Sequence, residues 1–417
     1  MTTDNPSRRD VLAAGAQITA AALAPGVAMA AAPALPAGVT PFRLNVPQAR
    51  IDRIMARVKD VEWPDAPQVA DPWAYGAGLE NMKELVDWWA TRYNWRARED
   101  AINAFPQFMA KVEDYDIHFI HVRGSGKNPT PLLLLHGWPN TFLEFVKVIL
   151  PLAHPEDFGG KAEDGFSVIV PSLPGFGFSS KPKKPISMRT VARLMDKLMA
   201  ETLGYKGYIV QGGDIGMAIA REMGYDAREC KGVHFNLLVA GGQPTVGDEE
   251  KKAAESYARF RQDEGAYSHI NSTKPLTQAY GMTDSPVGTA AWIFEKFVTW
   301  ADVKETDPWS VYTRNHVIDN VMIFMITNTY QTAAWYYAGG REEPQPPRQG
   351  KIEKPTAFLH FKNDIGFWPR SYAERHFSTI LRWTEIPEGG HFGPYEKPDE
   401  FMDDLRAFDR QLRTIKT

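Results

Sequence analysis

Asp214 stands at the centre of the segment Gln211-Gly212-Gly213-Asp214-Ile215-Gly216. The residues before it, 207–210, are apolar and predict a short buried strand, and residues 217–223 predict a helix. A strand, a tight glycine turn and a helix are the surroundings of a nucleophile elbow, here with Asp in place of the usual Ser. A carboxylate at this position would attack a substrate and form an ester with it. The alternative is that Asp214 only caps the helix.

Three further residues with useful chemistry follow predicted strands. Trp138 follows the apolar run 131–135, Asp364 follows 356–361, and His391 follows 381–386. Alternating strands and helices predict a mostly parallel sheet, and active groups gather at the carboxyl ends of such strands. The order Asp214, Asp364, His391 is nucleophile, acid, histidine, which is the order of α/β-hydrolase triads. Other carboxylates lie nearby, but none just past a strand end: Glu353, Glu374 and Glu385.

Composition narrows the class of protein. The chain has 417 residues, 43% of them hydrophobic, and a net charge of −4. It is long enough for one large domain with additions or for two domains, and its charge gives no support for binding nucleic acid or an anionic membrane surface. Cys230, the single cysteine, precedes a predicted strand, which favours a buried structural thiol.

His118 and His121 form an H-x-x-H pattern, but on a strand they would point to opposite faces, which argues against a metal site. We expect neither a metal nor a cofactor.

The N-terminus has the features of a targeting segment. Ser7-Arg8-Arg9-Asp10-Val11-Leu12 resembles a twin-arginine export signal, and an alanine-rich stretch follows it up to Ala32. Ala28-Met29-Ala30 fits a cleavage site. We therefore expect residues 1–32 to be an export signal and the protein to be periplasmic. The alternative is an amphipathic or membrane-anchoring helix, but Pro25-Gly26 and the weak hydrophobicity of alanine argue against a stable span.

Two stretches outside the predicted sheet are largely helical. The first runs from Phe42 to Asn103 and contains apolar residues at helical spacing, which usually indicate core. The second runs from about 243 to 350, is rich in aromatic residues, and interrupts the strand pattern. We interpret the second stretch as an insertion into the α/β core.

Motifs throughout the chain carry a resemblance to a known family. The sequence resembles epoxide hydrolases of the microsomal and juvenile-hormone type, which have the α/β-hydrolase fold. The similarity covers nearly everything from Pro41 to the C-terminus and rests on these segments: Pro41-Phe42-Arg43, Trp63-Pro64, Phe105-Pro106-Gln107-Phe108, Ile117-His118-Phe119, His136-Gly137-Trp138-Pro139, Pro174-Gly175-Phe176-Gly177-Phe178-Ser179, Gly212-Gly213-Asp214, Ser272-Thr273-Lys274-Pro275, Asp284-Ser285-Pro286-Val287-Gly288 and Gly389-Gly390-His391-Phe392. It implies an N-terminal meander over 40–115, a hydrolase core over 116–242 and 351–417, and a helical cap over 243–350.

The resemblance also implies a role for each site residue. Asp214 matches the family nucleophile, His391 its general base, and Asp364 the acid that orients the histidine. Two cap tyrosines donate protons to the epoxide oxygen in this family. Tyr267 matches the first, and Tyr337 is favoured over Tyr336 as the second. The oxyanion hole would consist of the backbone N–H groups of Trp138 and Ile215.

This sequence departs from the family pattern at two places. Ile215 stands where Trp is common, and Asn140-Thr141 replaces the usual Gly-Ser. The expected function is an exported epoxide hydrolase that acts on a small apolar epoxide with water. One alternative is a haloalkane dehalogenase, which shares the Asp nucleophile, although Ile215 and the matched tyrosines count against it. The other is a catalytically silent ligand-binding module on a hydrolase scaffold. No oligomeric state is predicted.

Overall fold

The computed structural model describes residues 35–239, 244–366 and 368–415. The expected export signal, including Ala28-Met29-Ala30, lies outside the described residues. Within them, no helix combines the length and the apolar character that crossing a bilayer requires.

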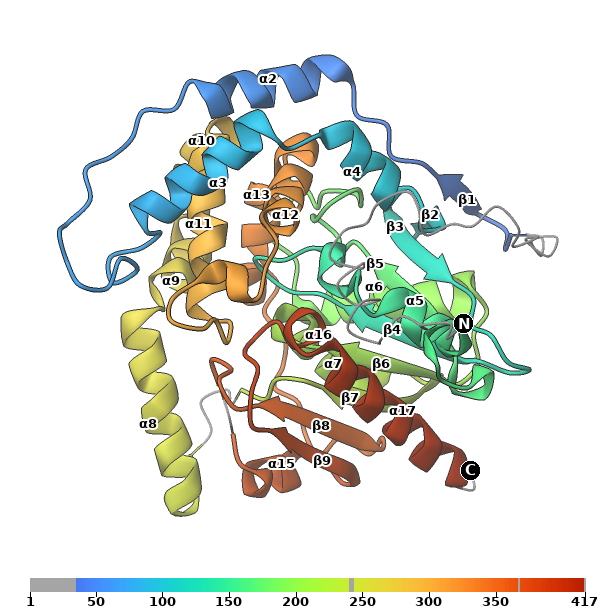
Figure 1. Cartoon of the computed structure of the whole chain (residues 1–417). Helices are drawn as coiled ribbons and strands as arrows, with labels where there is room; N and C mark the ends of the chain where they lie inside the picture. Colours follow the sequence, from blue (N-terminus) through green and yellow to red (C-terminus); the bar gives the residue numbers. More distant parts are fainter. Residues whose placement is uncertain (1–34, 240–243, 367, 416–417) are drawn as a thin grey trace, which may run out of the picture.

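A single sheet forms the centre of the molecule (Figure 1). Among the described residues it has nine strands in the order β1-β2-β3-β5-β4-β6-β7-β8-β9. Strands β1 to β3 are antiparallel, β3 is antiparallel to β5, and β4 to β9 pair in parallel, so the prediction of a mostly parallel sheet is confirmed. The strands are β1 Val39–Phe42, β2 Gln107–Val112, β3 Tyr115–Val122, β4 Thr130–Leu135, β5 Phe166–Pro171, β6 Tyr208–Gly212, β7 Cys230–Phe235, β8 Thr356–Phe361 and β9 Ile380–Ile386.

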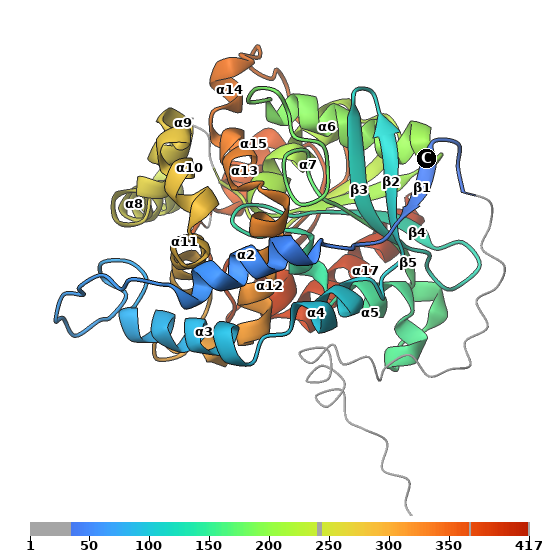
Figure 2. The ribbon, with the colours of Figure 1, turned by 90° about the horizontal axis from the view of Figure 1, so that it is seen from above.

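Helices cover both faces of the sheet (Figure 2). Successive residues of β7 face opposite sides: Val233 packs towards Gly224 of α7, and Nε2 of His234 lies 3.0 Å from Oδ2 of Asp404 on α17. Because both faces are covered, β4 and β5 are fully buried and apolar along almost their whole length. The covering helices are α5 Ile149–Ala153, α6 Met188–Lys197, α7 Asp214–Asp226, α15 Arg370–His376, α16 Gly393–Glu396 and α17 Pro398–Thr414, and a π-helical turn over Leu198–Thr202 continues α6.

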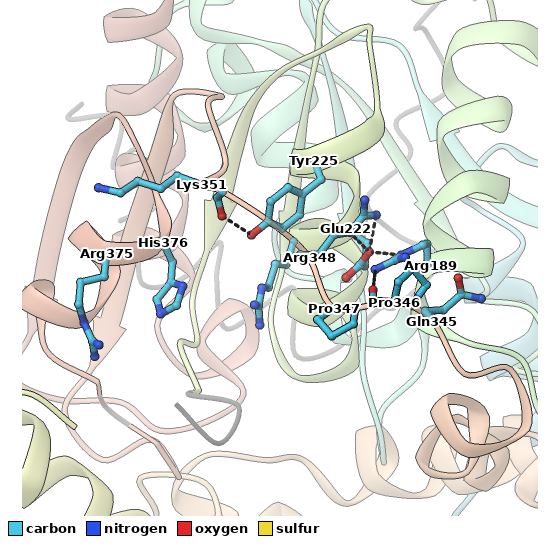
Figure 3. A pocket seen from close by; sticks show the side chains of 12 residues that line it. Arg189, Glu222, Tyr225, Gln345, Pro346, Pro347, Arg348, Lys351, Arg375 and His376 are labelled. Atoms are coloured by element: carbon cyan, nitrogen blue, oxygen red, sulfur yellow. Dashed lines mark hydrogen bonds and ion pairs between the residues drawn. The ribbon is translucent and has the colours of Figure 1, made fainter. Parts of the chain in front are cut away.

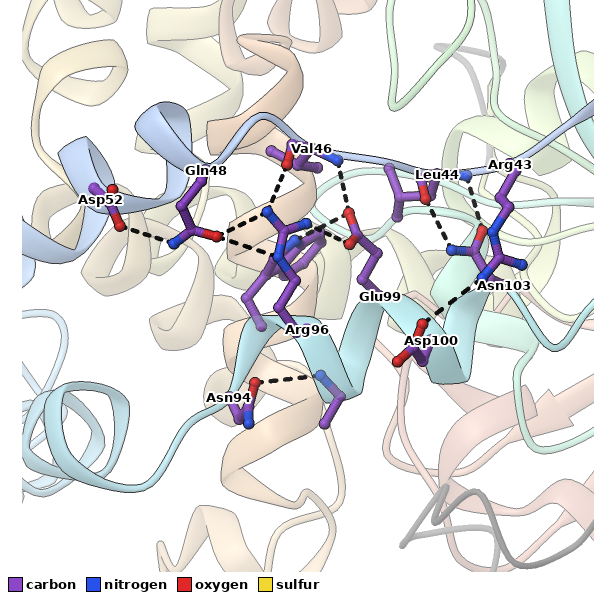
Figure 4. Close-up of polar contacts among 12 residues, drawn as sticks. Arg43, Leu44, Val46, Gln48, Asp52, Asn94, Arg96, Glu99, Asp100 and Asn103 are labelled. Atoms are coloured by element: carbon purple, nitrogen blue, oxygen red, sulfur yellow. Dashed lines mark hydrogen bonds and ion pairs between the residues drawn. The ribbon is translucent and has the colours of Figure 1, made fainter.

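The N-terminal part of the chain joins the sheet and also reaches the cap. It contributes β1 and β2, together with α2 Gln48–Lys59, α3 Leu79–Thr91 and α4 Trp95–Ile102. Its apolar stripes face inward, as their spacing predicts, with Ile54 and Val58 of α2 and Leu85 of α3 buried. The link between β1 and α2 is fixed from α4: Glu99 accepts the N–H of Val46 at 2.7 Å (Figure 4). The expectation that residues 42–103 are mostly helical is confirmed by α2, α3 and α4, whereas β1 was not predicted.

The insertion between β7 and β8 forms a helical cap. Its helices are α8 Gly247–Asp263, α9 Ala266–Thr273, α10 Pro275–Asp284, α11 Pro286–Thr299, α12 Arg314–Thr327, α13 Tyr330–Ala334 and α14 Gly339–Glu342. Helices α2 and α3 contact α11 and α12 of the cap. The buried carboxylate of Asp319 on α12 accepts Nη2–H of Arg98 on α4 at 2.6 Å. The N-terminal part therefore ties the cap to the core.

The segment that leaves the cap is anchored to the helix behind Asp214. Arg348 and Arg189 both donate to the carboxylate of Glu222 on α7, each through Nε at 2.8 Å (Figure 3). Arg348 also pairs with Asp226 of the same helix. The chain thus returns from the cap to β8 along a path fixed to α7.

Candidate active site

The turn that carries Asp214 is sharply strained. Asp214 follows β6, opens α7 and has a φ of +45°, a value that side-chain-bearing residues rarely adopt. A methyl group at Gly212 would lie 2.2 Å from the carbonyl oxygen of Gly216, and one at Gly216 would lie 2.1 Å from that of Leu135. Only glycines permit this close approach. The turn therefore presents Asp214 at the carboxyl end of β6, as in a nucleophile elbow.

Each oxygen of the Asp214 carboxylate has a defined neighbour. Oδ1 accepts the backbone N–H of Trp138 at 2.8 Å, and Oδ2 lies 3.4 Å from Nε2 of His391. The loop after β4 makes the first contact possible, because any side chain at Gly137 would overlap the Asp214 side chain. Ile215, the other predicted oxyanion donor, is buried in the first turn of α7, and among the described residues no hydrogen bond from its N–H to Asp214 is present.

His391 is buried between two carboxylates. Its Nδ1 lies 2.8 Å from Oδ1 of Asp364, which also accepts the N–H of Ile365 at 2.6 Å. Burial lowers the pKa of His391, but Asp364 and Asp214 act more strongly and raise it to about 10. The imidazole is therefore charged in the resting site. Among the other candidate acids, Glu385 accepts from Trp383, and Glu374 pairs with Arg370.

Two cap tyrosines lie over this site. The ring of Tyr267 on α9 stacks on Trp138, with centroids 5.0 Å apart, and is nearly perpendicular to Tyr337. The rings of the two tyrosines face each other with their centroids 5.7 Å apart. Burial raises the pKa of both phenols well above their ordinary value, and the charge of Asp214 acts in the same direction. Both therefore remain protonated and can serve as donors.

The neighbouring tyrosine has a different partner. The hydroxyl of Tyr336 donates to the carbonyl of Pro174 at 2.9 Å, and its ring packs on Phe176. Adjacent residues of the 3₁₀ turn Trp335–Tyr337 thus point to different surroundings. Tyr337 and not Tyr336 thus faces Tyr267, and its role as the second donor stays a prediction.

Sequence reasoning missed a third acid near the triad. Glu144 is buried in the 3₁₀ turn Phe142–Phe145, shortly after Trp138. Burial raises the pKa of Glu144 to about 8, and the charge of Asp214 adds to this, whereas His391 and the N–H of Gly137 oppose it. Glu144 follows no predicted strand end, so the search for catalytic groups passed over it. The available signal was a carboxyl within an otherwise apolar segment.

The elevated pKa of Glu144 predicts a specific pH dependence of stability. Between the ordinary value of 4.5 and about 8, the folded protein binds a proton that the unfolded chain releases. The contribution of Glu144 to the free energy of unfolding therefore falls as pH rises through this window, by up to about 1.4 kcal/mol per pH unit. Glu144→Gln removes this dependence. We therefore expect the urea midpoint of the variant to rise relative to that of the parent as the pH is raised from 5 to 9.

The matched control is Glu80→Gln, because Glu80 is exposed on α3. Parallel pH profiles for the parent and Glu144→Gln would contradict the assignment of a buried, protonated Glu144.

The residues of the H-x-x-H pattern have partners other than a metal. The two ring nitrogens of His118 contact Ser172 and Gln107 at 2.9 and 3.0 Å, and His121 contacts the hydroxyl of Tyr205. In the part of the chain that the structure describes, no group of three or more His, Cys, Asp or Glu side chains could hold a metal ion.

Comparison with known proteins extends the likeness over nearly the whole chain. The family model for the epoxide hydrolase N terminus matches residues 39–145, and that for the alpha/beta hydrolase fold matches residues 130–398. Epoxide hydrolase 1 of Oryctolagus cuniculus is 30% identical over 405 residues, which cover 89% of this chain and 88% of the relative. The chain belongs to the epoxide hydrolase family. The sequence resemblance and the expected α/β-hydrolase fold are thereby confirmed.

Solved structures of epoxide hydrolases agree with this membership. The Aspergillus niger enzyme superposes with a TM-score of 0.80 at 30% identity, covering 91% of this chain and 99% of that one. The juvenile hormone epoxide hydrolase of Bombyx mori gives a TM-score of 0.82 at 27% identity, covering 91% and 96%. In this family member, the sheet therefore positions Asp214, Asp364 and His391 on a scaffold that other epoxide hydrolases share.

Proposed function

We propose that the protein hydrolyses small apolar epoxides to vicinal diols through a covalent ester on Asp214. The observation that carries this proposal is the position of two facing tyrosines, Tyr267 and Tyr337, over an Asp–His–Asp triad. The pair provides donors for an oxygen leaving group, and the triad provides a nucleophile with a base beside it. Ring opening requires these groups together.

The first step opens the ring. A carboxylate oxygen of Asp214 attacks an epoxide carbon, the carbon–oxygen bond breaks, and the alkoxide takes a proton from Tyr267 or Tyr337. A carboxylate suits this displacement at a saturated carbon, because the resulting ester can be hydrolysed at its own carbonyl.

Ester formation also changes the charge around His391. Esterified Asp214 carries no negative charge, so one of the two carboxylates that raise the pKa of His391 no longer acts on it. His391 can then return its proton to the tyrosinate and become a neutral base. The chemistry of the first step thereby prepares the base for the second.

The second step releases the diol. His391 takes a proton from water, the resulting hydroxide attacks the ester carbonyl, and Asp364 stabilises the imidazolium. The N–H of Trp138 contacts Oδ1 of Asp214, which supports the proposal that this N–H stabilises the oxyanion together with the N–H of Ile215. Collapse of the intermediate expels the alkoxide, which takes the proton of the new Asp214 carboxyl group, so that the diol leaves, Asp214 is again a carboxylate and His391 keeps the proton it took from water.

A comparison of two substrates tests this function. Purified enzyme incubated with styrene oxide or with 1-chlorohexane is assayed for diol and for chloride. We expect diol from the epoxide, no chloride, and no diol with Asp214→Asn. Chloride release would instead favour a haloalkane dehalogenase. Inactivity towards aromatic, terpenoid and long-chain epoxides would favour the ligand-binding module.

We also propose export to the periplasm by the twin-arginine route, on the basis of Arg8 and Arg9 and the alanine-rich stretch that follows them. Replacing both arginines by lysine is expected to leave full-length precursor in the cytoplasm, measured by fractionation and immunoblotting. Arg43→Lys, a surface change beyond the signal, is the control and should leave export unchanged. Periplasmic accumulation of the double variant at the parental level would contradict the proposal.

A further inference from the structure

The loop that carries His391 is held by all of its backbone N–H groups from 389 to 392. The N–H of Gly390 and that of Phe392 each donate to the carboxylate of Glu396 at 2.8 Å. The N–H of Gly389 donates to Oδ2 of Asp302 at 2.8 Å, and that of His391 donates to the carbonyl of Trp300 at 2.8 Å. Two acceptors thus come from Glu396 at the end of α16, and two from the cap segment that follows α11.

The two carboxylates are also joined to each other and to the loop of the catalytic acid. Oε2 of Glu396 accepts the N–H of Asp302 at 2.8 Å, so Glu396 bonds the cap and the His391 loop at once. Oδ1 of Asp302 accepts Nδ2–H of Asn363 at 2.9 Å, and the N–H of Asn363 donates to the carbonyl of Gly389. Asn363 directly precedes Asp364. The loops of both His391 and its orienting acid therefore meet at this joint, which consists of Trp300, Asp302, Asn363 and Glu396.

Little space remains for movement within the joint. A methyl group at Gly390 would lie 2.6 Å from the carbonyl oxygen of Trp300 and 2.7 Å from the nitrogen of Asp302. The ring of Trp300 contacts both the ring of His391, at a centroid distance of 5.2 Å, and that of Tyr267, at 4.9 Å. One cap segment thus touches the proposed base and one proposed proton donor.

We propose that Glu396 and Asp302 are positioning residues that set the distance between His391 and Asp214 and couple it to the cap. The inference rests on the proposed function, in which His391 acts on the ester and not on the epoxide. Displacing His391 should therefore slow ester hydrolysis much more than ester formation. A uniform loosening of the fold would instead slow both steps.

The variants Glu396→Gln and Asp302→Asn test the proposal. Each amide keeps one oxygen that can accept hydrogen bonds. Its NH₂ group is only a donor, so it cannot accept a hydrogen bond from the backbone N–H that faces it. The control is Glu388→Gln, because Glu388 lies on the same loop with an exposed side chain paired to Lys397. Burial raises the pKa of Glu396 to about 7 although its three N–H donors act to lower it, so rates are measured at pH 9, where the carboxylate is ionised.

Single turnovers with enzyme in excess over styrene oxide are quenched, and the ester on the Asp214 peptide is followed by mass spectrometry. In both variants we expect ester decay to slow by about 10- to 100-fold, which is the scale of rate loss that a small misplacement of a catalytic group causes. We expect ester formation to stay within about threefold of the parent. Glu388→Gln should match the parent in both steps.

Parental decay rates in folded variants, or equal slowing of both steps, would overturn the proposal. If Glu396→Gln does not fold, as judged by circular dichroism, Asp302→Asn decides. Failure of both to fold would assign the joint a purely structural role and also overturn the proposal. Parental enzyme that forms no ester in this assay would contradict the proposed function instead, so the two failures are distinguishable.

Discussion

His391→Gln is expected to trap the ester on Asp214. In this variant the carboxylate can still attack the epoxide. The base that activates water is missing, because Nε2 of His391, 3.4 Å from Oδ2 of Asp214 in the parent, has been replaced by an amide. An adduct on the Asp214 peptide should therefore accumulate to nearly one per enzyme, while steady-state turnover falls by about 10⁴-fold or more, as loss of a triad member does in other hydrolases. Mass spectrometry of the quenched enzyme measures the adduct, and diol formation measures turnover.

The control for the adduct is Asp214→Asn, which should form none because a neutral amide is a poor nucleophile. Isotope labelling gives an independent measurement on the parent. With enzyme in excess in ¹⁸O-water, the oxygen added to the first diol should come from Asp214 and be mostly unlabelled. Fully labelled diol in the first turnover, with no adduct in His391→Gln, would mean that water attacks the epoxide directly and that Asp214 is not the nucleophile.

Removing both cap hydroxyls is expected to nearly abolish ring opening. Tyr267→Phe and Tyr337→Phe should each slow ester formation only in part, because the other phenol can still donate a proton. The double variant should lose both donors. General acid catalysis contributes about 10²- to 10⁴-fold in typical enzymes, which sets the scale for the double change. Pre-steady-state rates of ester formation are the measurement, since later steps do not involve the leaving oxygen.

Tyr336→Phe is the matched control for this pair. Its hydroxyl bonds the carbonyl of Pro174, so its loss should leave ester formation close to the parental rate. A silent Tyr337→Phe together with a strong effect of Tyr336→Phe would reverse the assignment of the second donor.

The sequence predicted the sheet and the triad because their signals are local. Apolar runs predict β4, β5, β6 and β8, the more mixed segments of β7 and β9 are also predicted as strands, and Asp214, Asp364 and His391 each follow the end of a strand. In a parallel sheet those ends lie at one edge, so placing the strands also placed the residues. The same reasoning could not find β1, whose four residues are extended only because they pair with β2 far along the chain.

The parts of the site that escaped prediction depend on contacts between distant segments. Glu396 and Asp302 are 94 positions apart, and neither carboxylate shows its function until the backbone N–H groups around it are in place. The preference for Tyr337 over Tyr336 rests on the family resemblance, because two identical neighbouring residues carry no signal of the direction in which each side chain of a short turn points. Glu144 required knowledge of burial, which only the packed structure provides.

The cap is fastened to the rest of the molecule on more than one side. Arg98 of the N-terminal part pairs with the buried Asp319 of α12, and Arg348 anchors the returning chain to α7. Asp302, in the cap segment after α11, accepts the N–H of Gly389 in the His391 loop. Breaking several such contacts at once is costly, so wide hinge opening on every catalytic cycle is disfavoured. Epoxides would then reach Asp214, whose side chain is 16% exposed, without a large movement of the cap. Substrates too wide to reach Asp214 without displacing the cap should therefore associate more slowly, because binding that requires a conformational change has a lower association rate constant.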